Sequence, residues 1–90
     1  AKESVEKTIP TGNGPASIIE FPESDGRKIL VASSRDDAVH LVDVHAAQVM
    51  QTIEVGHWPV MMRLAPSKRL AAVANFGEST ISLIDIAHLG

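Results

Sequence analysis

The sequence contains no cysteine, so no disulfide can brace its 90 residues. A chain of this length buries only about 60–65% of the surface that it exposes when unfolded. We therefore expect the fold to need support from outside the chain. Because only the presence of cysteines would report a redox compartment, their absence leaves the cytoplasm, the periplasm and the cell exterior equally open.

Strong charge of one sign and long hydrophobic runs are also missing. The net charge is −3 and the eight basic residues are scattered singly or in pairs. The sequence thus offers no stripe for a nucleic-acid backbone and no polybasic patch for a membrane surface. Its apolar stretches fall well short of the roughly 18–20 residues that cross a bilayer, and none resembles a signal peptide. We expect no nucleic-acid partner and no membrane insertion.

Familiar catalytic signatures are absent as well. The sequence has no Ser-His-Asp set, no glycine-rich phosphate loop, no paired-carboxylate motif and no CxxC or CxxCH element. Its composition, 44% hydrophobic and 21% charged, is that of one ordinary globular domain. These features favour a protein that is not a complete enzyme, and they predict no catalytic residue.

What the sequence does contain is an internal repeat, with five identities at an offset of 44 and, after a two-residue shortening, five more at an offset of 42. The first five pairs are Thr8 and Thr52, Ile9 and Ile53, Gly12 and Gly56, Pro15 and Pro59, and Pro22 and Pro66. The others are Arg27 and Arg69, Val31 and Val73, Ala32 and Ala74, Leu41 and Leu83, and Asp43 and Asp85. A period of this length is typical of four-stranded β-propeller blades.

The content of each repeat is β and not helical. Short β-branched runs alternate with turn residues, as at 34–37. Several runs are apolar at consecutive positions, which indicates sheets covered on both faces. The predicted strands span residues 16–21, 28–33, 38–43 and 48–55 in the first repeat, and 60–65, 70–75 and 80–86 in the second.

The fold that follows is all-β, with β-propeller blades of four antiparallel strands and two blades offset by one strand. The chain forms a single propeller segment, residues 1–90, with repeat 1 at about 12–55 and repeat 2 at about 56–90. Residues 4–11 match 48–55 and are expected to be an outer strand that completes a neighbouring blade. The second repeat lacks such a strand.

Two blades cannot close a ring alone, because their open faces and strand edge would stay exposed. The chain is either a fragment of a longer propeller, or one of several identical chains that exchange residues 4–11 onto the strand at 81–86. A start at Ala1 without methionine fits a processed terminus or a piece of a longer protein. The expected partners are therefore the remaining blades, a protein partner or further copies of this chain.

The repeat resembles that of the YVTN family of β-propeller proteins over residues 8–86. The matching elements are Gly56-His57-Trp58-Pro59, Val73-Ala74-Asn75, the strand at 81–85 and the run at 52–56. The first repeat departs from the pattern at Ser33 and Ser34, and the second lacks Asp-Gly in its turn. Neither departure alters the predicted fold.

The resemblance implies several functions, because YVTN members serve as surface-layer modules, binding proteins and parts of periplasmic redox enzymes. We expect a scaffold or binding module for protein or small-ligand interaction, in the periplasm or outside the cell. The alternative is a segment of a periplasmic redox enzyme that depends on a metal or haem.

The first candidate site is His57 in the G-x-x-P loop, with Trp58 beside it. Imidazole combined with the thioethers of Met61 and Met62 could hold copper or ligate haem iron, although no cofactor is the main expectation. In the structural interpretation, Trp58 packs between blades, the methionines fill the core and His57 is an exposed loop residue.

The second candidate pair is Glu20 and Arg63, charges on the innermost strands. Channel-lining charges can bind ligands, but a mutual ion pair is the favoured explanation. The remaining polar candidates are expected to be structural or solvated: His40, His45 and His88, the strand-ending Asp43 and Asp85, and the turn at 35–37.

Overall fold

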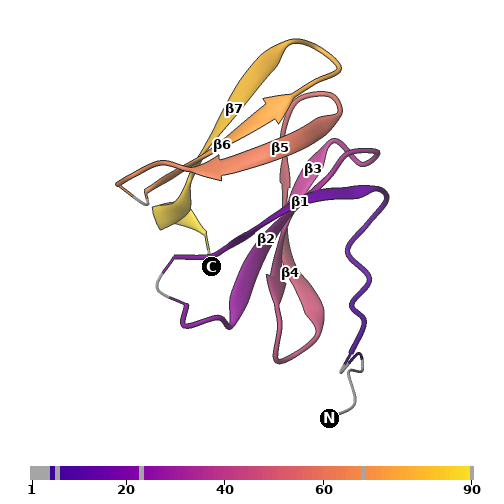
Figure 1. The fold of residues 1–90 in the computed structure, drawn as a ribbon, viewed down its shortest axis with the longest axis vertical. Helices are drawn as coiled ribbons and strands as arrows, with labels where there is room; N and C mark the ends of the chain where they lie inside the picture. The colour runs from indigo at the N-terminus through magenta and orange to yellow at the C-terminus, as the bar shows by residue number, and fades with distance from the viewer. Residues whose placement is uncertain (1–4, 6, 23, 68, 90) are drawn as a thin grey trace.

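The computed structural model describes residues 5, 7–22, 24–67 and 69–89, which form two antiparallel sheets (Figure 1). Blade 1 consists of β1 (Pro15–Glu20), β2 (Lys28–Ser33), β3 (Ala38–Asp43) and β4 (Gln48–Glu54), and blade 2 of β5 (Pro59–Leu64), β6 (Leu70–Asn75) and β7 (Thr80–Asp85). A short 3-10 helix, η1 (Ile86–His88), follows β7. Strand order follows chain order in each sheet.

The predicted fold class is confirmed: the chain is all-β, with one four-stranded blade and a second blade that is one strand short. Every predicted strand forms, and its bounds agree within one residue. This agreement is expected because β-branched runs and turn residues are local signals. No helix in the described part of the chain is long and apolar enough to span a membrane.

The sequence repeat is also a repeat of backbone hydrogen bonds. The Ser34 N–H donates to the Gly14 carbonyl over 2.8 Å, and its counterpart in blade 2, the Phe76 N–H, donates to the Trp58 carbonyl over 2.9 Å. Gly14 and Trp58 both have the left-handed backbone, with φ of 68° and 57°. Glycine adopts this conformation freely, but tryptophan does not, so the loop bonds must hold Trp58 in place.

The hydrophobic core lies between the two blades, where one face of blade 1 packs against one face of blade 2. We call these the front face of blade 1 and the back face of blade 2. The buried core residues of the front face are Leu30, Ala32, Val39 and Leu41, and those contributed by blade 2 and the segment after it are Met62, Ala71, Val73, Ile84 and Ile86.

The segment before β1 lies against the opposite side of blade 1, its back face. The Ser33 hydroxyl donates to the Thr11 carbonyl over 3.4 Å, and the Lys7 ammonium donates to the Val44 carbonyl over 3.3 Å. Val5 and residues 7–11 belong to no strand of the single chain. Of the predicted outer strand 4–11, positions 4 and 6 lie outside the described residues. Its pairing with a neighbouring blade stays a prediction.

Candidate functional site

Because the antiparallel strands follow one another in chain order, four short connecting segments lie at one end of the two blades. Antiparallel pairing sets Pro15 opposite Ser33, and Pro59 opposite Asn75. The two G-x-x-P loops therefore lie beside the β2–β3 and β6–β7 turns. We call this end the GxxP end; it comprises residues 12–14, 34–37, 55–58 and 76–79.

One acid in each blade holds the adjacent G-x-x-P loop. The Asp36 carboxylate accepts the Asn13 N–H over 3.0 Å, and Glu78, at the same position of the repeat, accepts the His57 N–H over 3.0 Å. The Asn13 N–H lowers the pKa of Asp36. The Thr80 hydroxyl, followed by the His57 N–H, lowers the pKa of Glu78. Both bonds stabilise the ionised acids.

Asp37 makes a different contact, because it joins blade 1 to the loop that begins blade 2. Its Oδ1 accepts the Trp58 N–H over 2.9 Å and lies 3.1 Å from the Nδ1 of His57. A carboxylate can only accept, so Nδ1 of His57 carries the proton of this bond. The second ring nitrogen, Nε2, makes no hydrogen bond to the described residues.

The contact of Asp37 predicts a pH dependence. The Trp58 N–H, and after it the His57 ring, lower the pKa of Asp37 from its ordinary 3.8. A lowered pKa in the folded chain contributes stability above the unfolded pKa, and this contribution is lost as pH falls through the folded pKa. We expect Asp37→Asn to lose less stability than the parent chain on acidification, as measured by melting temperature from about pH 6 to pH 3.

Asp25→Asn is the matched control for this change, because Asp25 lies in the β1–β2 turn and its carboxylate makes no hydrogen bond to the described residues. If the melting temperatures of Asp37→Asn and the parent chain fell equally between about pH 6 and pH 3, the stabilising role of the ionised Asp37 would be contradicted. Titration of the Asp37 carboxyl by NMR would then show an ordinary pKa.

A shallow depression of about 330 Å³ lies beside this contact. Trp58 is 52% exposed there, and its ring meets the His57 ring edge to face at 6.4 Å between centroids. The lining thus offers an aromatic surface, an imidazole and a guanidinium within one depression. Its residues are Ser34, Arg35, Asp37, His57 and Trp58.

The structure places the two methionine candidates apart from each other. Met61 is 56% exposed and Met62 is 3% exposed, since consecutive residues of β5 point to opposite faces. Met62 belongs to the core between the blades, whereas His57 belongs to the GxxP end. Among the described residues, no group of three or more His, Cys, Asp or Glu side chains could hold a metal ion.

Glu20 and Arg63 are both exposed on the innermost strands, β1 and β5. The ion pairs found within the described ranges all involve histidine, and none joins Glu20 to Arg63. The favoured explanation of these two charges as a mutual pair is therefore not found in the single chain.

The interpretation of the turn at 35–37 as merely solvated is wrong for Asp36 and Asp37, because each carboxylate holds a loop amide. A signal for Asp36 was present in the sequence: an acid recurs at Glu78, at the offset of 42. Asp37 has Ser79 as its counterpart, so the repeat gave no sign of its role.

The structural interpretation of Asp43 and Asp85 is confirmed. Their carboxylates accept the N–H groups of Ala46 and Ala87, over 2.9 and 3.0 Å. His40 is buried, and its Nδ1 lies 3.1 Å from the Thr52 hydroxyl oxygen. Its Nε2 makes no hydrogen bond but lies 3.7 Å from the Oδ2 of Asp36. The prediction of a satisfied or solvent-facing His40 is therefore met at only one ring nitrogen.

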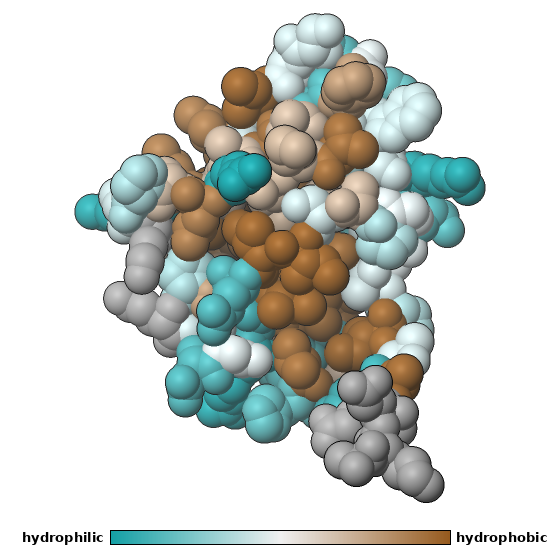
Figure 2. Space-filling view, in the orientation of Figure 1, coloured by the Kyte–Doolittle hydropathy of each residue, from teal (hydrophilic) through white to brown (hydrophobic). Residues whose placement is uncertain are grey.

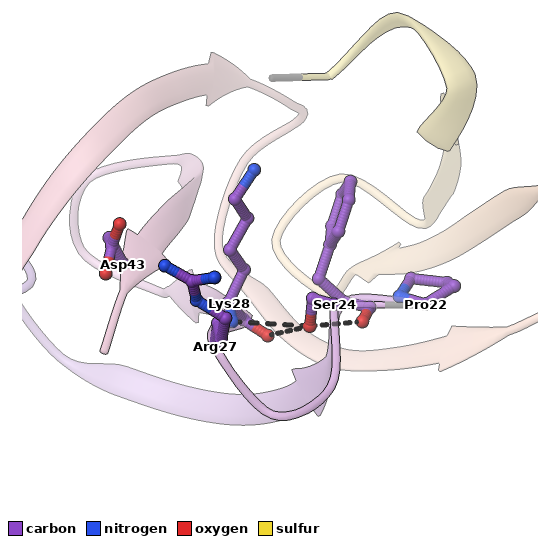
Figure 3. A pocket seen from close by; sticks show the side chains of 6 residues that line it. Pro22, Ser24, Arg27, Lys28 and Asp43 are labelled. Carbon is purple, nitrogen blue, oxygen red and sulfur yellow. Dashed lines mark hydrogen bonds between the residues drawn. The ribbon is translucent and has the colours of Figure 1, made fainter. Parts of the chain in front are cut away.

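A second depression, of about 380 Å³, lies at the opposite end of blade 1 (Figure 3). The Ser24 hydroxyl closes the β1–β2 turn by donating to the Phe21 carbonyl over 2.8 Å and accepting the Lys28 N–H over 3.3 Å. Lys28 lies over the Phe21 ring, with Nζ 5.9 Å from its centroid. These contacts explain Ser24 and Lys28 as residues that stabilise the β1–β2 turn.

Comparison with known proteins supports the fold. No known family profile matches the sequence, and no curated protein matches it either. Among solved structures, the chain is similar to hydrazine synthase of Kuenenia stuttgartiensis, with 28% sequence identity and a TM-score of 0.61. The match covers 82% of this chain and 20% of that protein. This chain thus spans about one fifth of the length of the protein that it matches.

Proposed function

We propose that the chain is a propeller-type scaffold or binding module, of the YVTN kind, that works as a segment of a larger assembly. The observation that carries this proposal is the front face of blade 1, which is fully covered by blade 2, while the same positions of blade 2 are uncovered. Leu41 is 0% exposed and its counterpart Leu83 is 66% exposed. Soluble proteins rarely leave such a face open, so blade 2 is built to receive a further blade.

Binding of ligands or partners is assigned to the depression at the GxxP end. The exposed indole of Trp58 offers an aromatic surface, and the guanidinium of Arg35 suits a carboxylate. The Asp37 carboxylate holds the backbone of Trp58 through its N–H, which limits the backbone entropy lost on binding. The chemistry fits a small aromatic carboxylate, or an aromatic and acidic segment of a partner protein.

Fluorescence of Trp58 tests this assignment. The chain has one tryptophan and no tyrosine, so the emission reports on this depression alone. We expect benzoate to change the emission with a dissociation constant on the order of 1 mM, and Arg35→Ala to weaken binding by about tenfold.

Arg69→Ala is the matched control, because Arg69 lies in the β5–β6 turn at the opposite end of the blades. It should leave the benzoate response unchanged. An emission that does not respond to benzoate, or that responds equally in both arginine variants, would contradict binding at the GxxP end.

The second candidate function is a segment of a metal- or haem-dependent periplasmic redox enzyme. The similarity to a protein named hydrazine synthase favours it. The Asp37 carboxylate orients the His57 ring through Nδ1, an arrangement common for histidines that bind metal through the other nitrogen. Met62 is buried in the core, so His57 would act without it and further ligands would come from elsewhere in the assembly.

Metal and haem content distinguish the two functions. If the redox function holds, the purified chain incubated with haemin or copper, and with free imidazole in place of the ligands from elsewhere in the assembly, should retain the cofactor, and His57→Ala should lose it. A sample with no visible absorption, and no iron or copper by elemental analysis after that incubation, removes this alternative.

A further inference from the structure

The face of blade 2 that points away from blade 1 is apolar except for the exposed Arg63, and no other blade of the described residues covers it. Met61, Ile81 and Leu83 are 56%, 69% and 66% exposed. In the space-filling view, hydrophobic side chains are interspersed with polar ones over the β5–β7 part of the molecule, and a larger hydrophobic area lies below it (Figure 2). The cross-strand register places the following residues on this side, which we call the outer face of blade 2: Met61, Arg63, Ala72, Ala74, Ile81 and Leu83.

The repeat indicates what covers such a face. Val39 and Leu41, the counterparts of Ile81 and Leu83, are fully buried, because the back face of blade 2 packs on them. The outer face of blade 2 therefore has the shape and chemistry to receive a second back face of the same kind.

The chain itself carries that second back face, on blade 1. Ile18, Val31 and Val42 occupy the positions that Met62, Val73 and Ile84 occupy in blade 2. They are equal or similar in size and apolar character. In the single chain Ile18 is 62% exposed, whereas Val31 and Val42 are 1% and 0% exposed. The front and back faces needed for one more blade contact are thus present at the two ends of one molecule.

Two unpaired backbone edges lie beside these faces. In the described part of the chain, β7 pairs only with β6, and residues 7–11 make no backbone–backbone hydrogen bond. Residues 7–11 already lie against the back face of blade 1 through the Thr11 carbonyl and the Lys7 ammonium. Ile53, the counterpart of Ile9 on β4, packs on the core between the blades.

We propose that a second copy of this chain binds head to tail, with the outer face of blade 2 on the back face of blade 1 of the next copy. Residues 7–10 of that copy then pair with β7 as its fourth strand. The observed pairs of β3 with β4, Val39 with Ile53 and His40 with Thr52, predict the register. By the repeat, Ile81 lies opposite Ile9, and Ser82 lies opposite Thr8.

This proposal rests on the proposed function, since it assumes that the two sheets are propeller blades. The contact joins two different surfaces, so it repeats from copy to copy until a ring closes. With about 4–8 blades in known propellers, a ring holds two, three or four copies.

The mass in solution tests the contact. We expect native mass spectrometry to show two, three or four times the chain mass of 9.6 kDa. Leu83→Glu and Ile18→Glu should each weaken association by at least about a hundredfold, because each buries a charge in an apolar interface. Mixed together, the two variants retain one intact outer face and one intact back face, so they should form a 1:1 dimer. Phe76→Glu is the control, since Phe76 is 77% exposed in the β6–β7 turn, away from both faces.

Cysteine cross-linking tests the register independently of stability. The chain lacks cysteine, so Ile9→Cys and Ile81→Cys introduce unique thiols. Opposed residues of antiparallel strands have Cα atoms about 4.5–5.5 Å apart, which suits a disulfide. A mixture of the two variants should give mainly the mixed disulfide. In the control, Met50→Cys replaces Ile81→Cys, because Met50 is exposed on β4. This mixture should give no more mixed disulfide than random collision produces.

A chain that stays monomeric and cross-links at random overturns the head-to-tail contact. If Trp58 still responds to benzoate in that monomer, the binding function stands and only this proposal fails. Association that survives both charge variants also contradicts the head-to-tail contact, because the copies would then bind through another surface. Equal cross-linking in the Met50→Cys mixture contradicts it for the same reason.

Discussion

Replacing Leu41 by alanine is expected to lower the free energy of unfolding by about 3 kcal/mol, whereas Leu83→Ala should lower it by less than about 1 kcal/mol. The two leucines hold the same position in the repeat, on β3 and on β7. Leu41 is 0% exposed between the blades and Leu83 is 66% exposed on the outer face of blade 2. The same substitution therefore leaves a cavity in one place and removes surface in the other.

Urea denaturation followed by circular dichroism measures both values, at a protein concentration low enough to keep the chain monomeric. Equal losses for the two variants would show that a partner covers blade 2 even there, or that the blades do not pack as described. At high protein concentration Leu83→Ala should also reduce association. The two concentrations therefore separate the contribution of Leu83 to the folding of one chain from its contribution to the contact between copies.

Gly56→Ala is expected to cost about 1–3 kcal/mol, because the loop has no room for a methyl group. An added Cβ would lie 2.6 Å from Cγ of Asn75 and 2.7 Å from Oε2 of Glu78. Asn75 is buried, and its amide donates to the hydroxyls of Thr80 and Ser82 over 3.2 and 2.8 Å, so it cannot swing aside freely. The cost is steric, since Gly56 does not have the left-handed backbone.

A double-mutant cycle checks this reason. In an Asn75→Ala background the methyl group has space, so Gly56→Ala should then cost clearly less than in the parent chain, with both values taken from urea denaturation. A cost that is the same in both backgrounds would mean that the methyl group clashes elsewhere. Gly12, the counterpart in blade 1, meets Asp36 and His40 in the same way, so the close approach belongs to both loops.

The candidate site was only partly predictable from the sequence. His57 and Trp58 were found because the G-x-x-P loop lies where an outer strand leads into the next inner strand. Asp37 was missed, since its bonds to Trp58 and His57 cross from one blade to the other. A contact between residues about 20 apart leaves no local pattern, and Asp37 has no acidic counterpart in the second repeat.

The sequence by itself determined the seven strands of the described residues, their turns and the difference between a four-stranded and a three-stranded sheet. These features depend on β-branching, turn residues and a repeat, all of which are local or periodic. Only the tertiary structure decided that Met62 is buried while Met61 is exposed, and that Leu41 is covered while Leu83 is not. The physical reason is that burial depends on which face of each sheet has another blade stacked against it. Identical residues at identical repeat positions therefore have different surroundings.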